Sequence, residues 1–391
     1  MRIAPSPRLL AFAPAVALAA ALVGCNHTKA TDAATDSTAT VDPWAGHDMG
    51  SWLSMKVTSD AKPAIAYYDR TADALGYAVG TISGASVAWA REDVDSYPDS
   101  NGLNPGDAGK YASMAIAADG TTWIAYQDTS NGTLKYATKP SGGAWTTGIA
   151  DSGEGPHSDA GYWASLALDP SGNPVISHYD AYKKDLRVAR WNGTAFSGSV
   201  AVTGTDYVPA DTATTAISAQ VGEYSKLLIG ADGTEYLAFY DRANTALMLA
   251  SGNGTSWSTE TVDDSGDVGQ WPDLALDSGS LYISYQDYGN QDLKLAKGTP
   301  GSFSVSTLDS GDMVGADSAI LVNGGGVHIV YQDGENNDIM QAKPSSGSFT
   351  YSKVSGDSGA LGFHNEIASI GGTVYAACYD YTSRAVWFGA I

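Results

Sequence analysis

Residues 269–309 read GQWPDLALDSGSLYISYQDYGNQDLKLAKGTPGSFSVSTLD. This stretch holds four short runs of alternating or β-branched residues, and each run is closed by Gly, Asp, Asn or Pro. Period-two alternation is typical of half-buried strands, and the closing residues are typical of hairpin turns. The stretch therefore predicts a four-stranded antiparallel sheet. A single sheet of this size has two large faces and cannot bury both of them alone, so it needs neighbours.

The chain supplies these neighbours as repeats of the same unit. The second run ends in Tyr-Asp or Tyr-Gln-Asp seven times, with 46 to 61 residues between successive motifs. The motifs end at Asp69, Asp128, Asp180, Asp241, Asp287, Asp333 and Asp380. A glycine opens each unit, at Gly50, Gly109, Gly161, Gly222, Gly269, Gly315 and Gly362. Seven four-stranded units at this period predict an all-β, seven-bladed β-propeller over residues 37–391.

The N-terminal residues predict export and a lipid anchor. Residues 1–24 begin with positive charge and continue with an apolar run too short to span a membrane, which is typical of a signal peptide. Residues 22–25 read LVGC and match the lipobox of bacterial lipoproteins, a resemblance that implies lipidation of Cys25. Residues 25–36 then form a tether, and the protein is expected in the cell envelope, at the outer membrane. A secretory signal followed by an incidental cysteine is the alternative.

A second N-terminal feature predicts how the ring closes. Residues 37–42 read STATVD and match STETVD at residues 258–263, the fourth strand of the fourth unit. The seventh unit reaches Ile391 after only three predicted strands. We therefore predict that residues 37–42 supply the fourth strand of the last blade, which would remove an exposed sheet edge. Deletion of residues 26–42 is expected to lower the melting temperature.

The charge balance narrows the range of partners. The chain has 43 acidic and 21 basic residues and a net charge of −22. No basic stripe is present to neutralise phosphates, so we expect no binding to nucleic acid. An acidic surface suits water, metal cations or basic partners, and we expect a monomer. If Cys25 is lipidated, Cys378 remains as the only other cysteine and no intramolecular disulfide forms.

Three repeated features resemble bacterial seven-bladed β-propeller lipoproteins. They are the Tyr-x-Asp motif, a Leu-x-x-Ala pattern in the third strand, as at Leu293–Ala296, and an aromatic residue after the last hairpin, as at Phe303. The units are also similar to propellers of the fucose-lectin and sialidase type, which implies the fold. Sialidases use an arginine triad, and this chain offers only Arg70, Arg242 and Arg384 in equivalent turns. The fold by itself does not imply an activity.

The mouth of the channel is the predicted binding site. The innermost strand of each blade lines the channel, so the residue two positions after each opening glycine should lie at the mouth. These residues are Trp52, Tyr111, Trp163, Tyr224, Trp271, Asp317 and His364. Aromatic faces beside carboxylates suit sugar rings. The alternative is that these aromatic side chains pack between the blades. The aspartates of the Tyr-x-Asp motifs are interpreted as turn caps.

The histidines suggest a different use of the same face. His364 opens the seventh unit and His47 precedes the first, so the two are neighbours across the predicted closure. Together with Asp48 and Glu366 they form a hypothetical set of ligands for zinc or a similar ion. An acidic loop at residues 99–102 is a candidate for calcium. His47, His157, His364 and Glu366 are also candidates for general acid and base.

Two functional hypotheses follow from these residues. The favoured one is a non-catalytic envelope lipoprotein that binds a glycan or a protein through the aromatic mouth. Its basis is the near-equivalence of the seven units, which show no unique acid–base set. The alternative is a hydrolase or lyase at the channel mouth, with or without a metal. A purely structural role is a third reading that the sequence leaves open.

Overall fold

The computed structural model describes residues 46–84, 86–96, 106–155, 158–204, 220–254, 256–323, 326–355 and 359–391. The described residues contain no helix that is long and apolar enough to cross a membrane. The described residues form seven antiparallel sheets. The strands of blades 1 to 3 are β1 Met49–Val57, β2 Pro63–Asp69, β3 Ala74–Ser83, β4 Ser86–Asp95, β5 Ala108–Ile116, β6 Thr122–Asp128, β7 Thr133–Lys139, β8 Thr146–Asp151, β9 Tyr162–Leu168, β10 Pro174–Asp180, β11 Asp185–Trp191 and β12 Phe196–Val202.

Blades 4 to 7 repeat the same order. Their strands are β13 Val221–Ile229, β14 Glu235–Asp241, β15 Ala246–Gly252, β16 Trp257–Asp263, β17 Val268–Asp277, β18 Ser280–Asp287, β19 Asp292–Thr299, β20 Ser302–Asp309, β21 Val314–Asn323, β22 Gly326–Asp333, β23 Asp338–Ser345, β24 Ser348–Lys353, β25 Phe363–Ile370, β26 Thr373–Asp380 and β27 Ala385–Ala390. Within every sheet the strands pair in chain order. The predicted seven-bladed β-propeller is confirmed.

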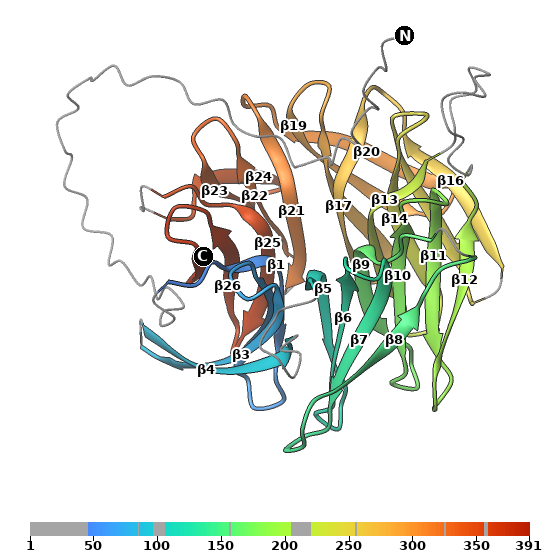
Figure 1. The fold of residues 1–391 in the computed structure, drawn as a ribbon. Helices are drawn as coiled ribbons and strands as arrows, with labels where there is room; N and C mark the ends of the chain where they lie inside the picture. The colour runs from blue at the N-terminus through green and yellow to red at the C-terminus, as the bar shows by residue number, and fades with distance from the viewer. Residues whose placement is uncertain are drawn as a thin grey trace, which may run out of the picture. The chain divides into compact units, whose positions relative to one another are not determined.

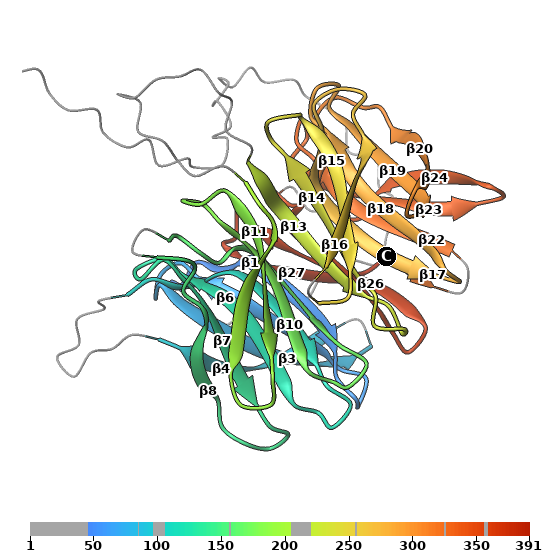
Figure 2. The ribbon, with the colours of Figure 1, turned by 90° about the vertical axis from the view of Figure 1, so that its right-hand side faces the viewer.

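The first strand of each blade lies at the centre of the ring, and it contacts the first strands of both neighbouring blades (Figure 1). The fourth strands lie at the outside, and a quarter turn of the view shows the strands of each sheet side by side (Figure 2). The second strand of each blade is largely buried, and β2 and β10 are buried along their whole length, because these strands pack against blades on both sides. This explains the near-continuous apolar character of these runs.

The hydrophobic core is divided among the seven interfaces between blades. One cluster joins Leu247 and Leu249 of blade 4 to Ile283 and Tyr285 of blade 5, and six equivalent clusters join the other neighbours. Burial of one such leucine or isoleucine side chain contributes about 2 kcal/mol. No blade has a core of its own, which is why one sheet alone would not be stable.

Blades 1 and 7 meet directly. The Met49 N–H donates to the Arg384 carbonyl at 3.0 Å, and the Tyr379 hydroxyl donates to Asp48 Oδ1 at 2.5 Å. Blade 7 has three strands within the described residues, and β27 is its last. The predicted closing strand, residues 37–42, lies outside the described residues, as do Cys25 and the loop at residues 99–102. The closing strand therefore stays a prediction.

The interpretation of the Tyr-x-Asp aspartates as turn caps is confirmed. Asp69 Oδ1 accepts hydrogen bonds from the backbone N–H groups of Thr71 and Ala72 at 2.9 and 3.1 Å. The aspartates of the six other blades cap their hairpins in the same way. These carboxylates are structural, because each one satisfies backbone donors that would otherwise be left unpaired.

Candidate functional site

The opening glycine of each blade is required by close packing. Gly269 has a φ of +103°, and a Cβ atom at this position would lie 2.6 Å from Cα of Leu247 in the preceding blade. Gly109 and Gly222 approach Leu75 and Leu186 equally closely. The leucine of the Leu-x-x-Ala pattern therefore packs on the backbone of the next blade. Only glycine combines this contact with a positive φ.

The residue two positions after each glycine also adopts a left-handed conformation. All seven residues have φ between 47° and 57°: Trp52, Tyr111, Trp163, Tyr224, Trp271, Asp317 and His364. The pairing with the second strand shifts register at this point, as between Gln270 and Asp273 of blade 5. Each inner strand thus begins with a β-bulge. A left-handed non-glycine residue costs about 1 kcal/mol, so the surrounding structure must hold it in place.

Hydrogen bonds between blades help to hold these bulges. The Ser225 hydroxyl donates to the Trp163 carbonyl at 3.1 Å, and the Ser318 hydroxyl donates to the Trp271 carbonyl at 3.1 Å. The Asn365 side-chain amide donates to the Asp317 carbonyl at 2.9 Å. Donor and acceptor come from adjacent blades in each case, so the bulge geometry is fixed across the interface and not by the bulge residue's own side chain.

We call the seven bulge residues the rim, and their side chains form an arc of touching rings. Ring centroids lie 4.8 to 5.7 Å apart along the sequence Trp271, Tyr224, Trp163, Tyr111, Trp52, His364. Neighbouring aromatic planes are inclined at 47° to 54°, near the rotation of about 51° that relates adjacent blades of a seven-bladed ring. Asp317 interrupts the arc between Trp271 and His364.

All seven rim residues line one open cavity of about 130 Å³. The rim side chains are half-buried, so they are neither free in solvent nor closed within a blade interface. Ser113, Ser225, Lys226, Ser318, Asn365 and Glu366 line the same cavity. The seven rim residues therefore lie together at one cavity, and their use as a ligand-binding site stays a prediction. The alternative, that the aromatic residues pack between blades, also holds in part, because neighbouring rings contact one another.

Below the rim, Lys226 and Glu366 line the cavity and form loose ion pairs with each other and with charged residues beside it. The Lys226 ammonium lies 3.7 Å from Asp273 Oδ1 and 4.0 Å from Glu366 Oε1. Glu366 Oε2 in turn lies 3.9 Å from the Lys56 ammonium. These separations are ion pairs without direct hydrogen bonds. The Lys226 side chain remains 37% exposed because it projects into the cavity.

Sequence reasoning named Glu366 as a candidate residue but missed Lys226 and Asp273. Lys226, Asp273 and Glu366 stand four positions after their opening glycines, and the same position in blades 1 to 3 is serine. The serine hydroxyls accept backbone N–H groups of the next blade, as Ser113 does from Leu166 at 2.9 Å. Alignment of the seven units on this column would have shown that blade 4 places a cation where its neighbours place small acceptors.

His364 and Asp317 form the polar side of the cavity. Burial lowers the pKa of His364 below its ordinary value, with Asp317 opposing and Arg70 reinforcing the effect. The imidazole is therefore neutral at pH 7. Within the described residues no hydrogen bond or ion pair joins the carboxylate of Asp317 to a side chain. Asn365 Oδ1 beside it is buried and receives no hydrogen bond from any described residue. This side of the cavity has unused acceptors.

The proposed metal site is not assembled. His47 Nδ1 contacts Asp69 Oδ2 at 2.7 Å, whereas His364 lies with Trp52 at the rim. Asp48 accepts from Tyr379 and faces Arg70 at 3.8 Å. Among the described residues no three His, Cys, Asp or Glu side chains are grouped so that they could hold a metal ion. The hypothesis that His47, Asp48 and His364 bind zinc is therefore wrong for this arrangement, because each has a different partner.

Only some of the candidate acid–base residues lie at the cavity. His364 and Glu366 both line the cavity. His47 does not line it, and His157 lies outside the described residues. The three arginines do not gather either: Arg242 binds Glu223 through Nε at 2.9 Å, Arg70 faces Asp48, and neither they nor Arg384 are among the described residues that line the cavity. The structure does not bring the arginines together as a carboxylate-binding triad at this mouth.

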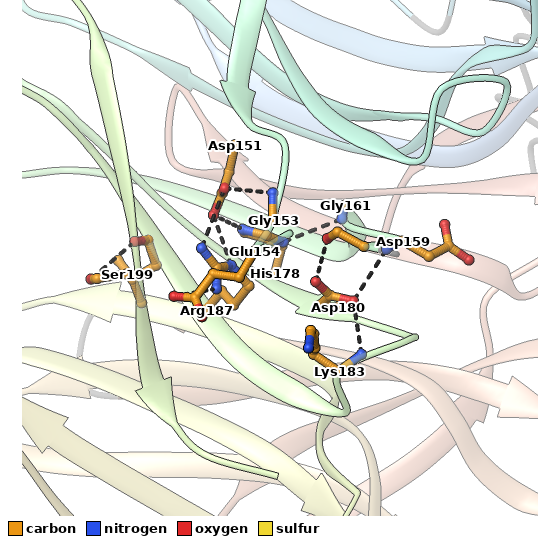
Figure 3. A network of polar contacts seen from close by, with 12 residues as sticks. Asp151, Gly153, Glu154, Asp159, Gly161, His178, Asp180, Lys183, Arg187 and Ser199 are labelled. Carbon is orange, nitrogen blue, oxygen red and sulfur yellow. Dashed lines mark hydrogen bonds and ion pairs between the residues drawn. The ribbon is translucent and has the colours of Figure 1, made fainter. Parts of the chain in front are cut away.

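A second polar cluster, whose side chains do not line the cavity, lies between blades 2 and 3 (Figure 3). Asp151 Oδ2 contacts His178 Nε2 at 3.1 Å and accepts from Arg187 Nε at 2.9 Å. His178 Nδ1 accepts the Gly161 N–H at 3.2 Å, which leaves the proton on Nε2 for Asp151. All three side chains are buried, and Figure 3 shows them pointing at one another. Although burial alone would raise it, the pKa of Asp151 is held well below its usual range by His178 and Arg187.

Comparisons with known proteins extend the description of the fold. No family model matches the sequence, and no curated protein matches it. Among solved structures, one that is similar to this chain is a PL25 polysaccharide lyase, an ulvan lyase bound to a GlcA(1-4)Rha3S saccharide. Its TM-score is 0.59 at 11% identity, and the match covers 86% of this chain and 90% of the lyase. The polysaccharide lyase Uly1 has a TM-score of 0.54 at 12% identity, over 93% and 94% of the two chains.

Two further kinds of propeller are similar to the chain. The SapL1 lectin, solved with alpha methyl fucoside, has a TM-score of 0.46 at 13% identity, over 72% of this chain and 92% of its own. The NanB sialidase from Streptococcus pneumoniae has a TM-score of 0.45 at 10% identity, over 87% and 68%. Lectin-type and sialidase-type propellers thus occur among the solved structures that are similar to this chain. At these identities the likeness extends to the fold alone.

Proposed function

We propose that this protein binds a glycan in the rim cavity without cleaving it. The observation that carries the proposal is that seven equivalent positions, five of them aromatic, line a single cavity. Sugar rings present apolar C–H faces that stack on aromatic side chains, and their hydroxyl groups need nearby polar partners. Asp317, Ser318 and Asn365 supply such partners on one side of the same cavity.

The fold gives independent support for a glycan over a protein ligand. The two solved structures with TM-scores of 0.59 and 0.54 are both polysaccharide lyases. A cavity of about 130 Å³ suits one sugar unit and not a protein surface. A protein partner would also need a broad interface, of roughly 800 Å² on each side.

Two exposed tyrosines suggest that the ligand is longer than one sugar. Tyr288 in the β18–β19 hairpin is 55% exposed, and Tyr381 in the β26–β27 hairpin is 61% exposed. Both hairpins follow the end of a second strand, so they lie on the rim side of the propeller. They flank blade 6, where Asp317 interrupts the arc of rings. We infer that a glycan chain leaves the cavity across this sector.

A glycan panel tests the proposal. We expect Trp163→Ala combined with Trp271→Ala to abolish binding, because the double change removes two rings of the arc. The matched control is Trp191→Ala, which removes a tryptophan from the opposite end of blade 3, where its ring contacts Trp123 at a centroid distance of 5.3 Å. Binding by the double variant equal to that of the wild type would place the glycan site elsewhere.

Cleavage of a glycan at the same cavity is the second candidate. It is favoured by one observation: His364 and Glu366 line the cavity together, and the imidazole is in its neutral, proton-accepting form at pH 7. Incubation with a polysaccharide panel would release new reducing ends or unsaturated products if the chain is an enzyme. His364→Ala should then stop product release while binding persists. No product from any polysaccharide that binds would remove this candidate.

The predicted lipid anchor belongs to the same proposal. We propose that Cys25 carries acyl chains that hold the propeller at the cell envelope. Growth with labelled palmitate should label the wild type and leave Cys25→Ser unlabelled and released from the membrane fraction. Equal membrane association of the two proteins would contradict the anchor without affecting the glycan proposal.

A further inference from the structure

The charges around the cavity do not cancel. Asp317, Glu366 and Lys226 line the cavity, and Asp273 and Lys56 lie beside it as ion-pair partners of Lys226 and Glu366, which gives three carboxylates and two ammonium groups. Glu366 lies within 4.0 Å of both lysines, and Asp273 lies within 3.7 Å of Lys226. Asp317 is the carboxylate for which no ion pair is found among the described residues.

Lys226 acts electrostatically on Asp317 but forms no ion pair with it among the described residues, and it already lies near Asp273 and Glu366. His364 next to it in the rim is neutral at pH 7. Arg70, whose charge acts on His364, faces Asp48 at 3.8 Å and is half-exposed. Asn365 donates to the backbone carbonyl of Asp317 and not to its carboxylate. The cavity therefore keeps one uncompensated negative charge, at the break in the arc of rings.

We infer that the cavity is selective for a saccharide that carries a primary ammonium group, bound at Asp317. This inference rests on the proposed function, because it names the class of sugar that the same cavity takes. An ammonium group offers three donors and a full charge, which match an unused carboxylate. Rings on both sides of Asp317 add a favourable environment for a cation. The acidic chain as a whole, with a net charge of −22, attracts a polycation and repels a uronate or sulfate polymer.

The neighbouring charges argue against an anionic sugar at this position. A uronate carboxylate would meet Asp317 and Glu366 in the same cavity. Among the described residues no arginine lines the cavity, and Lys226, the one lysine that does, already lies near two carboxylates. A neutral sugar remains acceptable to the aromatic arc but leaves the Asp317 carboxylate without a counter-charge. Amino sugars should therefore bind more tightly than neutral ones.

The test compares tetrasaccharides of matched length. Calorimetry or tryptophan fluorescence at pH 6.5 measures the affinity for β-1,4-linked glucosamine, N-acetylglucosamine and glucose tetramers, with methylammonium chloride as a probe without a sugar. We expect the glucosamine tetramer to bind about tenfold tighter than the glucose tetramer, since one charge-assisted hydrogen bond contributes this much. N-acetylation should remove the advantage because it removes the charge, and raising the salt should reduce it.

Two variants of equal charge locate the effect. Asp317→Asn should abolish the preference for glucosamine and leave the affinity for the glucose tetramer unchanged. Asp312→Asn changes the net charge equally, in the exposed loop before β21, and should keep the preference. An unchanged unfolding midpoint in both variants shows that they fold.

The outcomes separate this inference from the proposed function. Equal wild-type affinities for the three tetramers, or an intact preference in Asp317→Asn, would overturn the ammonium site while glycan binding stands. Binding of methylammonium as tight as the glucosamine tetramer would overturn the saccharide part. If none of a wider glycan panel binds, the proposed function fails, and this inference fails with it.

Discussion

The two Asp–His regions of this propeller use the same residue types in opposite ways. Between blades 2 and 3, Asp151 and His178 are buried and satisfied by each other, by Arg187 and by backbone groups. At the rim, Asp317 and His364 are half-buried, and the carboxylate of Asp317 has no side-chain partner among the described residues. The first arrangement supports the fold, and the second leaves capacity for a ligand. Partnering, and not residue type, distinguishes a structural polar group from a functional one.

The largest expected effect is a loss of stability on removing Asp151 from the buried cluster between blades 2 and 3. Asp151→Ala leaves the buried Arg187 cation with only the exposed Glu154 at 3.4 Å. We expect a loss of about 3–5 kcal/mol in the free energy of unfolding, as for removal of one partner of a buried pair. Asp317→Ala should change it by less than about 0.5 kcal/mol. Urea unfolding of both variants measures the contrast, and equal losses would erase the distinction between the two regions.

The next effect concerns the backbone that places the rim. Gly269→Ala adds a Cβ atom 2.6 Å from Leu247 at a φ of +103° and should cost more than about 2 kcal/mol. Gly279→Ala is the matched control: its φ is +81°, but no atom lies within 4 Å, so it should cost about 1 kcal/mol. If both changes cost the same, contact with the preceding blade does not fix the bulge.

A smaller expected effect is a pH dependence of stability caused by Asp151 in the buried cluster. The pKa of Asp151 is depressed in the folded state. Below pH 4 this carboxylate therefore takes up a proton in the unfolded chain but stays ionised in the folded protein. Stability that is present above pH 4 is then lost as the pH falls, by up to about 1.4 kcal/mol per pH unit from this group. Asp151→Asn should flatten the loss between pH 4 and pH 3 by about 1 kcal/mol, as measured by urea unfolding at each pH. A slope equal to that of the wild type would contradict the assignment.

The smallest expected effect is a pH dependence of ligand affinity at Asp317 and His364 in the rim. Burial lowers the pKa of His364, so the imidazole is neutral at pH 7 and takes up a proton only at lower pH. An imidazolium beside Asp317 would compete with a ligand ammonium, while Arg70 and Lys226 keep their charge throughout. We expect the affinity for methylammonium, whose own charge does not change over this range, to fall as His364 takes up a proton below pH 7. His364→Gln should remove this dependence with a change in stability of less than about 0.5 kcal/mol, and a fall that persists in the variant would assign it to another group.

Most of the fold follows from the sequence because the repeat is visible at fixed positions. The glycines, the Tyr-x-Asp motif and the leucine that packs on the next glycine are all local signals of one geometry. The rim was predictable for the same reason, since a position within the repeat determines a position around the channel. Trp52 and His364 touch although they are far apart in the chain, and the repeat alone indicates that they should.

The rest of the site was not predictable because it depends on which groups pair. Sequence spacing places His47 and His364 at the same closure, yet it does not reveal that Asp69 binds His47. In the same way, the lysine at position 226 reads as a surface residue until the inner strands are arranged around the channel. Partners that come from different blades are set by packing across an interface, and a single-sequence pattern does not contain that information.

The left-handed bulge has a consequence for how such a protein changes its specificity. Tryptophan, tyrosine, aspartate and histidine all occupy this conformation here, because neighbouring blades hold the backbone whatever side chain it carries. The side chains at the seven rim positions can therefore differ without a change in the backbone that holds them. A new ligand preference would need only different side chains at the rim positions, without a change in loop conformation or blade packing.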